Sequence, residues 1–391
     1  MAKKDKKQST FGLTLRRMFG IKPKQTMSFE EEEALQSPGR VIARNFFHKR
    51  TAVFGLVVFL AIFLFVMIGP HFLPIDLGYA DSSLTNLPPG YNMMAVPKEM
   101  QEAGIRAIAP GATYGLGVDN NGKVYIWGNT RITDTIDLAD VPDEVYEANI
   151  IDIAAGSDHV VALDDTGKLY FWGNTRLGQD RYQSNSDLVR EMKTGKFELK
   201  QLEASNQFSA IVDGEGNLYI WGNTSNRDID IRSKERLDEN ATREPRVYQG
   251  NIEKVALTEL AYIVLLKDGT VAYPGYSKDS PLLQQLPEEL TDGSVRVVDI
   301  AATAQGAAAV DENGKIYVWG NCTHGEKNIP ETDGKPVEIY GGRYHFSVLM
   351  DNGDVISWGD DTFGQSDVPA AVNKADGIET IYAGANQNYA I

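Results

Sequence analysis

The sequence predicts an all-β fold, a β-propeller of six full units plus a partial seventh, preceded by an amphipathic helix and one transmembrane helix. Two observations lead to this prediction. A strand-like motif ending in Trp-Gly recurs along most of the chain, and an uncharged apolar run precedes its first copy. The motif reads KVYIWGN at Lys123–Asn129 and returns as KLYFWGN, NLYIWGN, KIYVWGN and DVISWGD. Where neighbouring units both have the tryptophan, the two tryptophans are roughly 40–50 residues apart, which is a spacing typical of propeller blades.

The chain divides by composition into four segments. We expect a basic cytoplasmic head at 1–50, a transmembrane helix at 51–75, an extracytoplasmic linker at 76–104 and the propeller at 105–391. Residues before Thr51 contain twelve Lys/Arg and five Asp/Glu, a balance of +7, whereas the rest of the chain contains 26 and 49, a balance of −23. The charge therefore changes sign at the apolar run.

The apolar run Thr51–Ile75 has no formally charged side chain, and about 20 apolar residues are enough to span a bilayer. A buried core helix is one alternative, but a run this long without a polar face argues against it. A cleavable signal peptide is another, although its apolar part is only about 7–15 residues long and lies near the N-terminus. We predict an uncleaved membrane anchor. Basic residues flank its N-terminal side, which the positive-inside rule places in the cytoplasm: Arg40, Arg44, Lys49 and Arg50.

The head is expected to form two short helices. Ser28 and Glu31 have the spacing of a capping box. Ser37 and Pro38 then suit the N-cap and first position of a second helix, in which apolar residues alternate with arginines. Such a helix would lie in the membrane interface with its basic face toward the headgroups. An ordinary juxtamembrane flank is the alternative.

The stretch SPGRVIARNFFHKRTAVFGLVVFLAIFLFVMIGPHFLPIDL resembles the N-terminus of dipeptide/oligopeptide ABC transporter permeases of the OppC/DppC type. That family has a Ser-Pro, an Arg-rich elbow helix, a basic pair and an Ala-x-x-Gly-Leu opening before its first span. The matching residues are Ser37, Pro38, Arg44, Phe46, Lys49, Ala52, Gly55, Leu56, Gly69, Pro70 and Pro74. The resemblance covers about residues 28–90. No second run of spanning length follows in the sequence, and neither does the family's ATPase-contacting loop.

The repeats predict strands. In each unit two short apolar runs flank a turn rich in Asp, Asn and Gly, which is a hairpin pattern. A degenerate fourth unit has Pro274-Gly275 in place of Trp-Gly. A single blade cannot bury both faces, so a strand with a large aromatic residue should recur to fill the gap between neighbouring blades. We therefore assign a structural role to the repeated Trp-Gly pairs, which are Trp127-Gly128, Trp172-Gly173, Trp221-Gly222, Trp319-Gly320 and Trp358-Gly359. Small residues such as Gly111, Gly156 and Gly342 should permit crowding near the central axis.

The array resembles the RCC1-like propeller, whose repeats carry G-x-x-H-x-x-x-L, a D-x-x-G turn and a Trp-Gly strand. The second and sixth units match this pattern well, with His159 and His345 at its His position. The other units depart from it there with Tyr114, Phe208, Ala261, Gly306 and Gln387. The resemblance spans about residues 105–391.

A seventh unit opens as IETIYAGANQNYAI. Propellers of this kind close by pairing strands from both chain ends, so Tyr91–Pro97 is one candidate to complete this blade. We instead expect the sequence to be the front part of a longer protein, because both half a blade and further permease spans would then follow.

Other site types are not favoured by the sequence. Asp-rich turns such as DNNGK lack the ligand spacing of a calcium loop and suit hairpin turns instead. His159 and His345 have no Ser, Cys or paired carboxylate at a catalytic spacing, so we expect both to be hydrogen-bonded packing residues. Cys322 is the single cysteine, which excludes an intramolecular disulfide. We predict no metal, no cofactor and no catalytic residue. The acidic propeller also disfavours nucleic acid, which needs a basic surface.

Two long polar connections, 174–195 and 224–246, are candidate recognition loops, although most such loops are only tolerated insertions. The resemblances together imply a non-enzymatic, membrane-anchored component of peptide uptake with an extracytoplasmic propeller for protein or peptide recognition. Its implied partners are a second permease subunit, ATPase subunits and a substrate-binding protein. The alternative is a single-pass surface receptor or adhesin, and an enzyme is the third hypothesis. The ligand of the propeller cannot be read from the sequence.

Overall fold

The computed structural model describes residues 38–72, 93–184, 186–193, 197–223, 248–275, 279–331, 333–370, 372–373 and 378–391. The chain forms two compact units, Met1–Ala80 and Asp81–Ile391, which are considered separately below. The helix expected near Ser28 and the loop 224–246 lie outside the described residues.

The first unit contains two helices, α3 (Pro38–His48) and α4 (Arg50–Phe72). Helix α3 begins at Pro38 because proline needs no backbone N–H partner in the first turn. It is amphipathic, with exposed Ile42 and Phe47 beside its arginines. Helix α4 is apolar on all sides, and the stretch Arg50–Ile68 is long and apolar enough to cross a membrane. None of this stretch is buried by other parts of the structure, as expected for a helix whose solvent is lipid.

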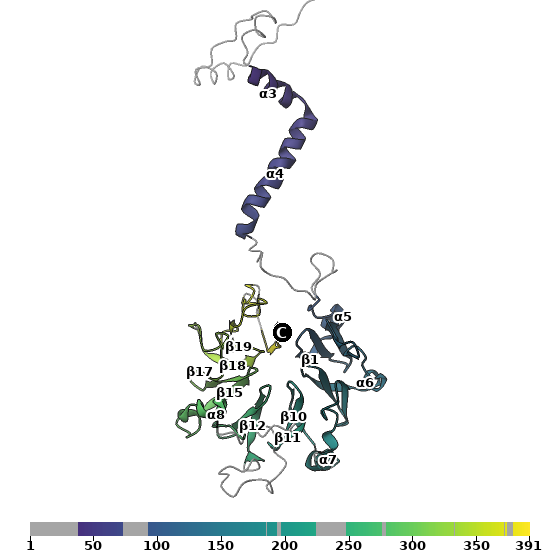
Figure 1. The fold of residues 1–391 in the computed structure, drawn as a ribbon, viewed down its shortest axis with the longest axis vertical. Helices are drawn as coiled ribbons and strands as arrows, with labels where there is room; N and C mark the ends of the chain where they lie inside the picture. Colours follow the sequence, from purple (N-terminus) through teal and green to yellow (C-terminus); the bar gives the residue numbers. More distant parts are fainter. Residues whose placement is uncertain are drawn as a thin grey trace, which may run out of the picture. The chain divides into compact units, whose positions relative to one another are not determined.

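The second unit is a propeller of sheets arranged around a common centre (Figure 1). Six sheets are three-stranded antiparallel meanders, and the seventh has two strands among the described residues. The blades, in order, are β1 (Ile105–Pro110), β2 (Tyr114–Asp119) and β3 (Val124–Gly128); β6 (Ile150–Ala155), β7 (His159–Asp164) and β8 (Leu169–Gly173); β9 (Leu199–Ala204), β10 (Phe208–Asp213) and β11 (Leu218–Gly222); β12 (Ile252–Leu257), β13 (Tyr262–Leu266) and β14 (Val271–Ala272); β15 (Val297–Ala302), β16 (Gly306–Asp311) and β17 (Ile316–Gly320); β18 (Pro336–Gly341), β19 (His345–Met350) and β20 (Val355–Gly359); and β21 (Ile381–Ala383) with β22 (Asn388–Ala390).

The first strand of every blade lies innermost and contacts the first strands of both neighbouring blades. The second strands are completely buried in most blades, with patterns such as Val-Val-Ala-Leu in β7. Hydrophobic clusters lie between consecutive blades, so the core is divided into wedges rather than gathered in one place. This is how a repeat array buries both faces of each sheet.

The ring closes between the first and seventh blades. Strand β1 contacts β21, and Tyr382 and Tyr389 pack beside Trp127. The backbone carbonyl of Met94 accepts hydrogen bonds from the Trp127 indole N–H (3.1 Å) and the Tyr389 hydroxyl (2.9 Å). Residues 93–97 form a turn and no strand. The segment that we considered for completing the seventh blade therefore fastens this seam without adding a strand to it.

Short elements connect the blades. They are α5 (Lys98–Ala103) before the first blade, the hairpin β4 (Arg131–Thr133) and β5 (Ile136–Asp137), α6 (Asp143–Glu147), η2 (Tyr182–Ser184), α7 (Ser186–Met192), α8 (Pro281–Gln284) and η5 (Glu288–Leu290). The candidate loop 174–195 thus includes η2 and α7. Leu188 of α7 is fully buried in the core, so part of this connection packs as core.

Candidate functional site

The repeated tryptophans all lie between blades. Each is buried, and each indole N–H donates to a backbone carbonyl in the segment that precedes its own blade. The bonds are Trp127 to Met94 (3.1 Å), Trp172 to Leu138 (2.9 Å), Trp221 to Gln179 (2.8 Å), Trp319 to Leu282 (3.1 Å) and Trp358 to Glu326 (2.7 Å). A buried indole needs such a partner. The tryptophan therefore joins a blade to the connection that leads into it.

The glycine after each tryptophan has a backbone conformation that other residues rarely adopt. The φ angles are +85° at Gly128, +89° at Gly173, +107° at Gly222, +94° at Gly320 and +116° at Gly359. A Cβ at Gly173 would lie 2.5 Å from the carbonyl oxygen of Asp158. Both the positive φ and this close approach require glycine.

His159 and His345 are buried and each contacts the next blade. The Nε2 atom of His159 lies 3.0 Å from the Ser209 hydroxyl, and that of His345 lies 2.9 Å from the Asn388 side-chain oxygen. Burial lowers the pKa of His345, which favours a neutral imidazole. Tyr114 bridges blades in the same place, with its hydroxyl donating to the Gly156 carbonyl at 2.7 Å.

The glycines before these rings are closely surrounded, since a Cβ at Gly156 or Gly342 would lie 2.5 Å from a backbone carbonyl oxygen of the next blade. A Cβ at Gly111, Gly156 or Gly342 would overlap the ring of the residue three positions later. The ring of Tyr114, for example, would lie 2.2 Å from a Cβ at Gly111. These glycines therefore make room for the bridging side chain.

The Asp-rich turns are closed by their own carboxylates. In four blades the first Asp accepts a backbone N–H four residues later with Oδ1 and a tyrosine hydroxyl with Oδ2. The pairs of acceptor and tyrosine are Asp119 and Tyr125, Asp164 and Tyr170, Asp213 and Tyr219, and Asp311 and Tyr317. At Asp164, burial raises the carboxyl pKa but these hydrogen bonds together outweigh it, so the pKa is lowered. The carboxylates therefore stabilise the hairpin turns by accepting their backbone N–H groups.

The inner strands surround a central cavity of about 300 Å³. Its wall consists mostly of small residues and backbone, with alanines from β1, β6, β9, β12, β15 and β21. The polar side chains that reach it are Glu203, Lys254, Tyr340, Thr380 and Tyr382. Strands or strand-flanking residues of all seven blades contribute to its wall.

One register position of the inner strands, directly after a β-bulge, carries a polar residue in most blades and so forms a polar row. It is Ala107 in the first blade and Asp152, Gln201, Lys254, Asp299 and Glu338 in the second to sixth blades. Thr380, directly before β21, has the corresponding place in the seventh unit. The bulge inserts one residue, so this position faces the following blade, while Ile150 and Ile153 of the second blade face the preceding one.

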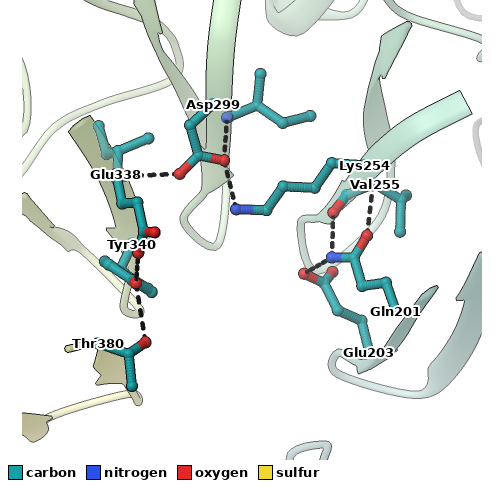
Figure 2. A network of polar contacts seen from close by, with 10 residues as sticks. Gln201, Glu203, Lys254, Val255, Asp299, Glu338, Tyr340 and Thr380 are labelled. Atoms are coloured by element: carbon teal, nitrogen blue, oxygen red, sulfur yellow. Dashed lines mark hydrogen bonds and ion pairs between the residues drawn. The ribbon is translucent and has the colours of Figure 1, made fainter. Parts of the chain in front are cut away.

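Several members of this row bond across to the next blade, as Figure 2 shows. Gln201 exchanges two hydrogen bonds with the backbone of Val255, at 2.8 and 2.9 Å. Lys254 Nζ lies 2.6 Å from Asp299 Oδ1, and Asp299 Oδ2 accepts the backbone N–H of Ile339 at 2.8 Å. These contacts connect β9, β12, β15 and β18 in sequence.

The chain of contacts continues to the seventh blade through Tyr340. Its hydroxyl donates to Glu338 and lies 3.0 Å from the Thr380 hydroxyl. Among the described residues Asp152 makes no side-chain bond of this kind to the next blade, and its Oδ1 accepts the backbone N–H of Ile153. The row is therefore connected on one side of the ring and open near Asp152 and Ala107.

Two carboxyl groups on the inner strands hold protons more tightly than usual, Glu203 in the cavity wall and Asp152 next to the lining residue Ile153. Burial raises the pKa of Glu203 to about 7, against an opposing effect of Lys254 and an added one of Asp299. Burial also raises the pKa of Asp152 to about 6. Both residues are partly buried. Because Lys254 is already paired with Asp299, an incoming cationic or hydrogen-bond-donating group would find Glu203 as its acceptor.

The cavity wall offers a carboxyl group, an ammonium group and hydroxyl groups to a ligand. Neither histidine at the repeated position lies in the cavity wall. Within the described residues, no three or more His, Cys, Asp and Glu side chains are placed to hold a metal ion. The sequence-predicted residues therefore build the scaffold, while the cavity residues Glu203, Lys254 and Tyr340 were missed. The signal that could have found Lys254 is the pattern apolar-x-polar-apolar at the start of every unit but the first, as in Ile-Glu-Lys-Val, whereas Glu203 and Tyr340 lie two residues after that polar position.

Comparison with known proteins agrees with this architecture. Residues 37–89 match the N-terminal TM domain of oligopeptide transport permease C, and residues 150–179 and 337–365 match the regulator of chromosome condensation (RCC1) repeat. No curated protein matches the chain in sequence. The solved structures similar to it include human WBSCR16, at 14% identity and a TM-score of 0.53, covering 74% of this chain and 86% of that one.

Another is Prp20p from Saccharomyces cerevisiae, at 18% identity and a TM-score of 0.52, covering 75% of this chain and 83% of that one. Identities this low establish the fold alone. The two matched families and the propeller define a membrane-anchored protein that carries an RCC1-like propeller. Its anchor is similar to the start of a peptide-transport permease.

Proposed function

We propose that the chain is a component of a peptide-uptake ABC transporter, and that its propeller recognises a protein or peptide on the extracytoplasmic side. One observation carries this proposal. The permease-like match at residues 37–89 includes both α3 and α4 and ends shortly before the first blade. The amphipathic α3 and the spanning α4 have the order that an elbow helix and a first span require. The propeller follows this first span in the sequence, where a permease has its first external loop.

The orientation is supported by charge. The N-terminal balance of +7 and the flanking arginines favour a cytoplasmic head. The half-buried Cys322 has a thiol pKa raised to about 11, mainly by burial and then by Glu326, so it should react slowly. In a Cys322→Ser background, an exposed Asp292→Cys should react with an impermeant maleimide on intact cells. A matched Lys4→Cys should react only after permeabilisation, and the opposite pattern would reverse the topology.

The proposed partners are a second permease subunit, ATPase subunits and a substrate-binding protein. Purification of the protein from mild-detergent extracts should recover ABC-type ATPases and a second permease in fixed proportion. Deletion of residues 37–72 should abolish that recovery, whereas a Glu203→Gln exchange in the propeller should not. If the purified protein carried no transporter subunit under any condition, the transport proposal would be wrong.

Recognition rather than catalysis is proposed for the propeller. The similar Prp20p structure is described together with its binding properties toward Gsp1p and histones, which shows that a propeller of this fold can bind proteins. In this chain the cavity offers Glu203 as an acceptor and the tyrosines Tyr340 and Tyr382 beside it. We therefore propose no enzymatic activity and expect the ligand to be a peptide or protein surface.

A single-pass surface receptor or adhesin is the second candidate. It is favoured by the single helix of spanning length that the described residues contain, since one span suffices for display but not for a transport path. Peptide-uptake measurements discriminate the two. Loss of this protein should reduce uptake of a labelled oligopeptide if it belongs to a transporter, and should leave uptake unchanged if it is a receptor.

A further inference from the structure

The central cavity contains a carboxyl group without a basic partner. Of the described residues that line the cavity, Glu203 and Lys254 alone are formally charged. The Nζ atom of Lys254 lies 2.6 Å from Asp299 Oδ1, and Figure 2 shows it directed toward Asp299 rather than toward Glu203. Among the described residues Glu203 forms no ion pair, and its Oε1 accepts the side-chain amide of Gln201 at 2.7 Å. The negative charge of this carboxylate is therefore not balanced by a neighbouring cation.

The position of the Glu203 carboxylate is fixed by its neighbour on the same strand. The side chain of Gln201 exchanges two hydrogen bonds with the backbone of Val255, at 2.8 and 2.9 Å, and the same amide nitrogen donates to Glu203. An acceptor that is held in place before a ligand arrives binds it without the entropic cost of being ordered. Burial raises the pKa of Glu203 to about 7, and Lys254 opposes this only in part. A cation beside the carboxylate would offset that cost of burial.

The rest of the wall suits a group with carbon atoms on one side and several N–H donors on the other. Alanines of the inner strands form its apolar part. The hydroxyls of Tyr340 and Thr380 lie 3.0 Å apart, on the opposite side of the cavity from Glu203 (Figure 2). An ammonium group has three donors and no acceptor, so a carboxylate and hydroxyl oxygens together can satisfy it. The volume of about 300 Å³ is at the lower limit of ligand pockets, which fits one side chain or a chain terminus.

We propose that the central cavity binds a primary ammonium group of a peptide, with the nitrogen at Glu203 and the attached carbon atoms against the alanines. The ammonium belongs to a lysine side chain or to the N-terminus of the peptide, since both present the same compact donor group. This inference rests on the proposed recognition of peptides by the propeller and does not depend on the transport role. An anionic ligand fits the wall less well, because Lys254 would have to leave Asp299 to bind it.

The test uses the full chain in mild detergent and three tripeptide amides of nearly the same shape. Acetyl-Ala-Lys-Ala-amide carries only a side-chain ammonium, Ala-norleucine-Ala-amide carries only a terminal one, and acetyl-Ala-norleucine-Ala-amide carries neither. Titration calorimetry up to about 10 mM peptide reaches the affinities expected for ligands of this size. It should show saturable binding of at least one charged peptide, which identifies the source of the ammonium. The uncharged peptide should bind at least about tenfold more weakly, because it lacks the charge-assisted hydrogen bond.

Two variants of the cavity separate a cationic ligand from an anionic one. Glu203→Gln keeps the shape of the side chain but removes its charge, and it should weaken binding of the better charged peptide at least about tenfold. Lys254→Met removes the one cation among the described lining residues and should not lower that affinity. The control Glu215→Gln changes an exposed turn residue and should leave the affinity unchanged. If a variant fails to fold, the three peptides on the unmodified protein still decide the matter.

Three results would overturn the proposal. Equal affinity of the charged and uncharged peptides would remove the ammonium site but leave peptide recognition intact. No binding of any of the three peptides would remove both, whereas recovery of transporter subunits on purification tests the transport role separately. Loss of binding in Lys254→Met together with unchanged binding in Glu203→Gln would show that the cavity takes an anionic ligand.

Discussion

Glu203 gives the propeller a pH-dependent stability that one substitution should remove. Burial in the cavity wall raises its pKa from the ordinary 4.5 to about 7. Each unit of such a change corresponds to about 1.4 kcal/mol, so the ionised carboxylate costs the folded state about 3 kcal/mol once the pH is well above 7. The folded state binds the proton more tightly than the unfolded chain. The stabilisation by Glu203 is therefore complete below pH 4.5 and is lost as the pH rises through about 7.

Glu203→Gln is the matched perturbation, because glutamine keeps the oxygen that accepts the Gln201 amide at 2.7 Å. Chemical denaturation of the full chain in detergent should be compared at pH 5 and pH 8. The variant should be more stable than the unmodified protein by about 3 kcal/mol at pH 8, and by less than about 1 kcal/mol at pH 5. Glu215→Gln, at an exposed turn, should change neither value.

Asp152 acts in the same direction, because its pKa is raised to about 6. Part of the pH dependence should therefore remain in Glu203→Gln and disappear when Asp152→Asn is added. If the unmodified protein and Glu203→Gln lose stability in parallel between pH 5 and pH 8, the carboxyl does not have the raised pKa, and the closed cavity wall that causes it is wrong.

Three further predictions concern the scaffold. Trp172→Ala should lower the free energy of unfolding by about 3–5 kcal/mol. Trp172→Phe should lower it less, because this variant loses mainly the 2.9 Å hydrogen bond to the Leu138 carbonyl. Thermal unfolding measures both effects. His159→Gln should cost clearly less than Trp172→Ala, because glutamine can still reach the Ser209 hydroxyl. Asp299→Ala should cost about 3 kcal/mol by stranding Lys254, and adding Lys254→Met should recover part of it in a double-mutant cycle.

The fold could be predicted because the sequence pattern of one blade recurs along the chain. Most units carry the same spacing of apolar residues, an Asp-x-x-Gly turn and Trp-Gly. A unit that departs from this pattern can therefore still be identified by comparison with the others. The fourth unit illustrates this. Pro274 replaces tryptophan, and its third strand shortens to Val271–Ala272, yet the adjoining Tyr273 is fully buried and the blade keeps its place.

The polar row of the cavity was not predictable by alternation alone. In Ile150–Ile153 two buried residues are three positions apart with Asp152 between them, which contradicts the period of two that a flat strand requires. The bulge reconciles them, but a bulge is a property of pairing between two strands. From the sequence of one strand alone, a polar residue at this position is predicted to be exposed to solvent. Only the packing of the neighbouring blade shows that it is partly buried.

The seam of the ring was also hidden from the sequence, because a backbone carbonyl makes it. Met94 provides that carbonyl, and a residue of any other type at this position has the same backbone carbonyl. The residues 93–97 show no strand or helix pattern. Comparison of the five indole hydrogen bonds shows the role of this segment. The tryptophans of the later blades donate to the connection that comes from the preceding blade, whereas Trp127 donates to Met94.

The same seam fastens the segment that follows the membrane helix in the sequence to the seventh blade. Tyr389 lies on β22, and its hydroxyl contacts both the Trp127 indole N–H, at 3.0 Å, and the Met94 carbonyl, at 2.9 Å. Tyr389→Phe keeps the ring packed edge-on against Trp127 but removes both hydroxyl contacts. We expect amide hydrogen exchange at residues 94–100 to become faster in this variant, while exchange in β18–β20 stays unchanged. Unchanged exchange at residues 94–100 would show that packing alone holds the turn at Met94.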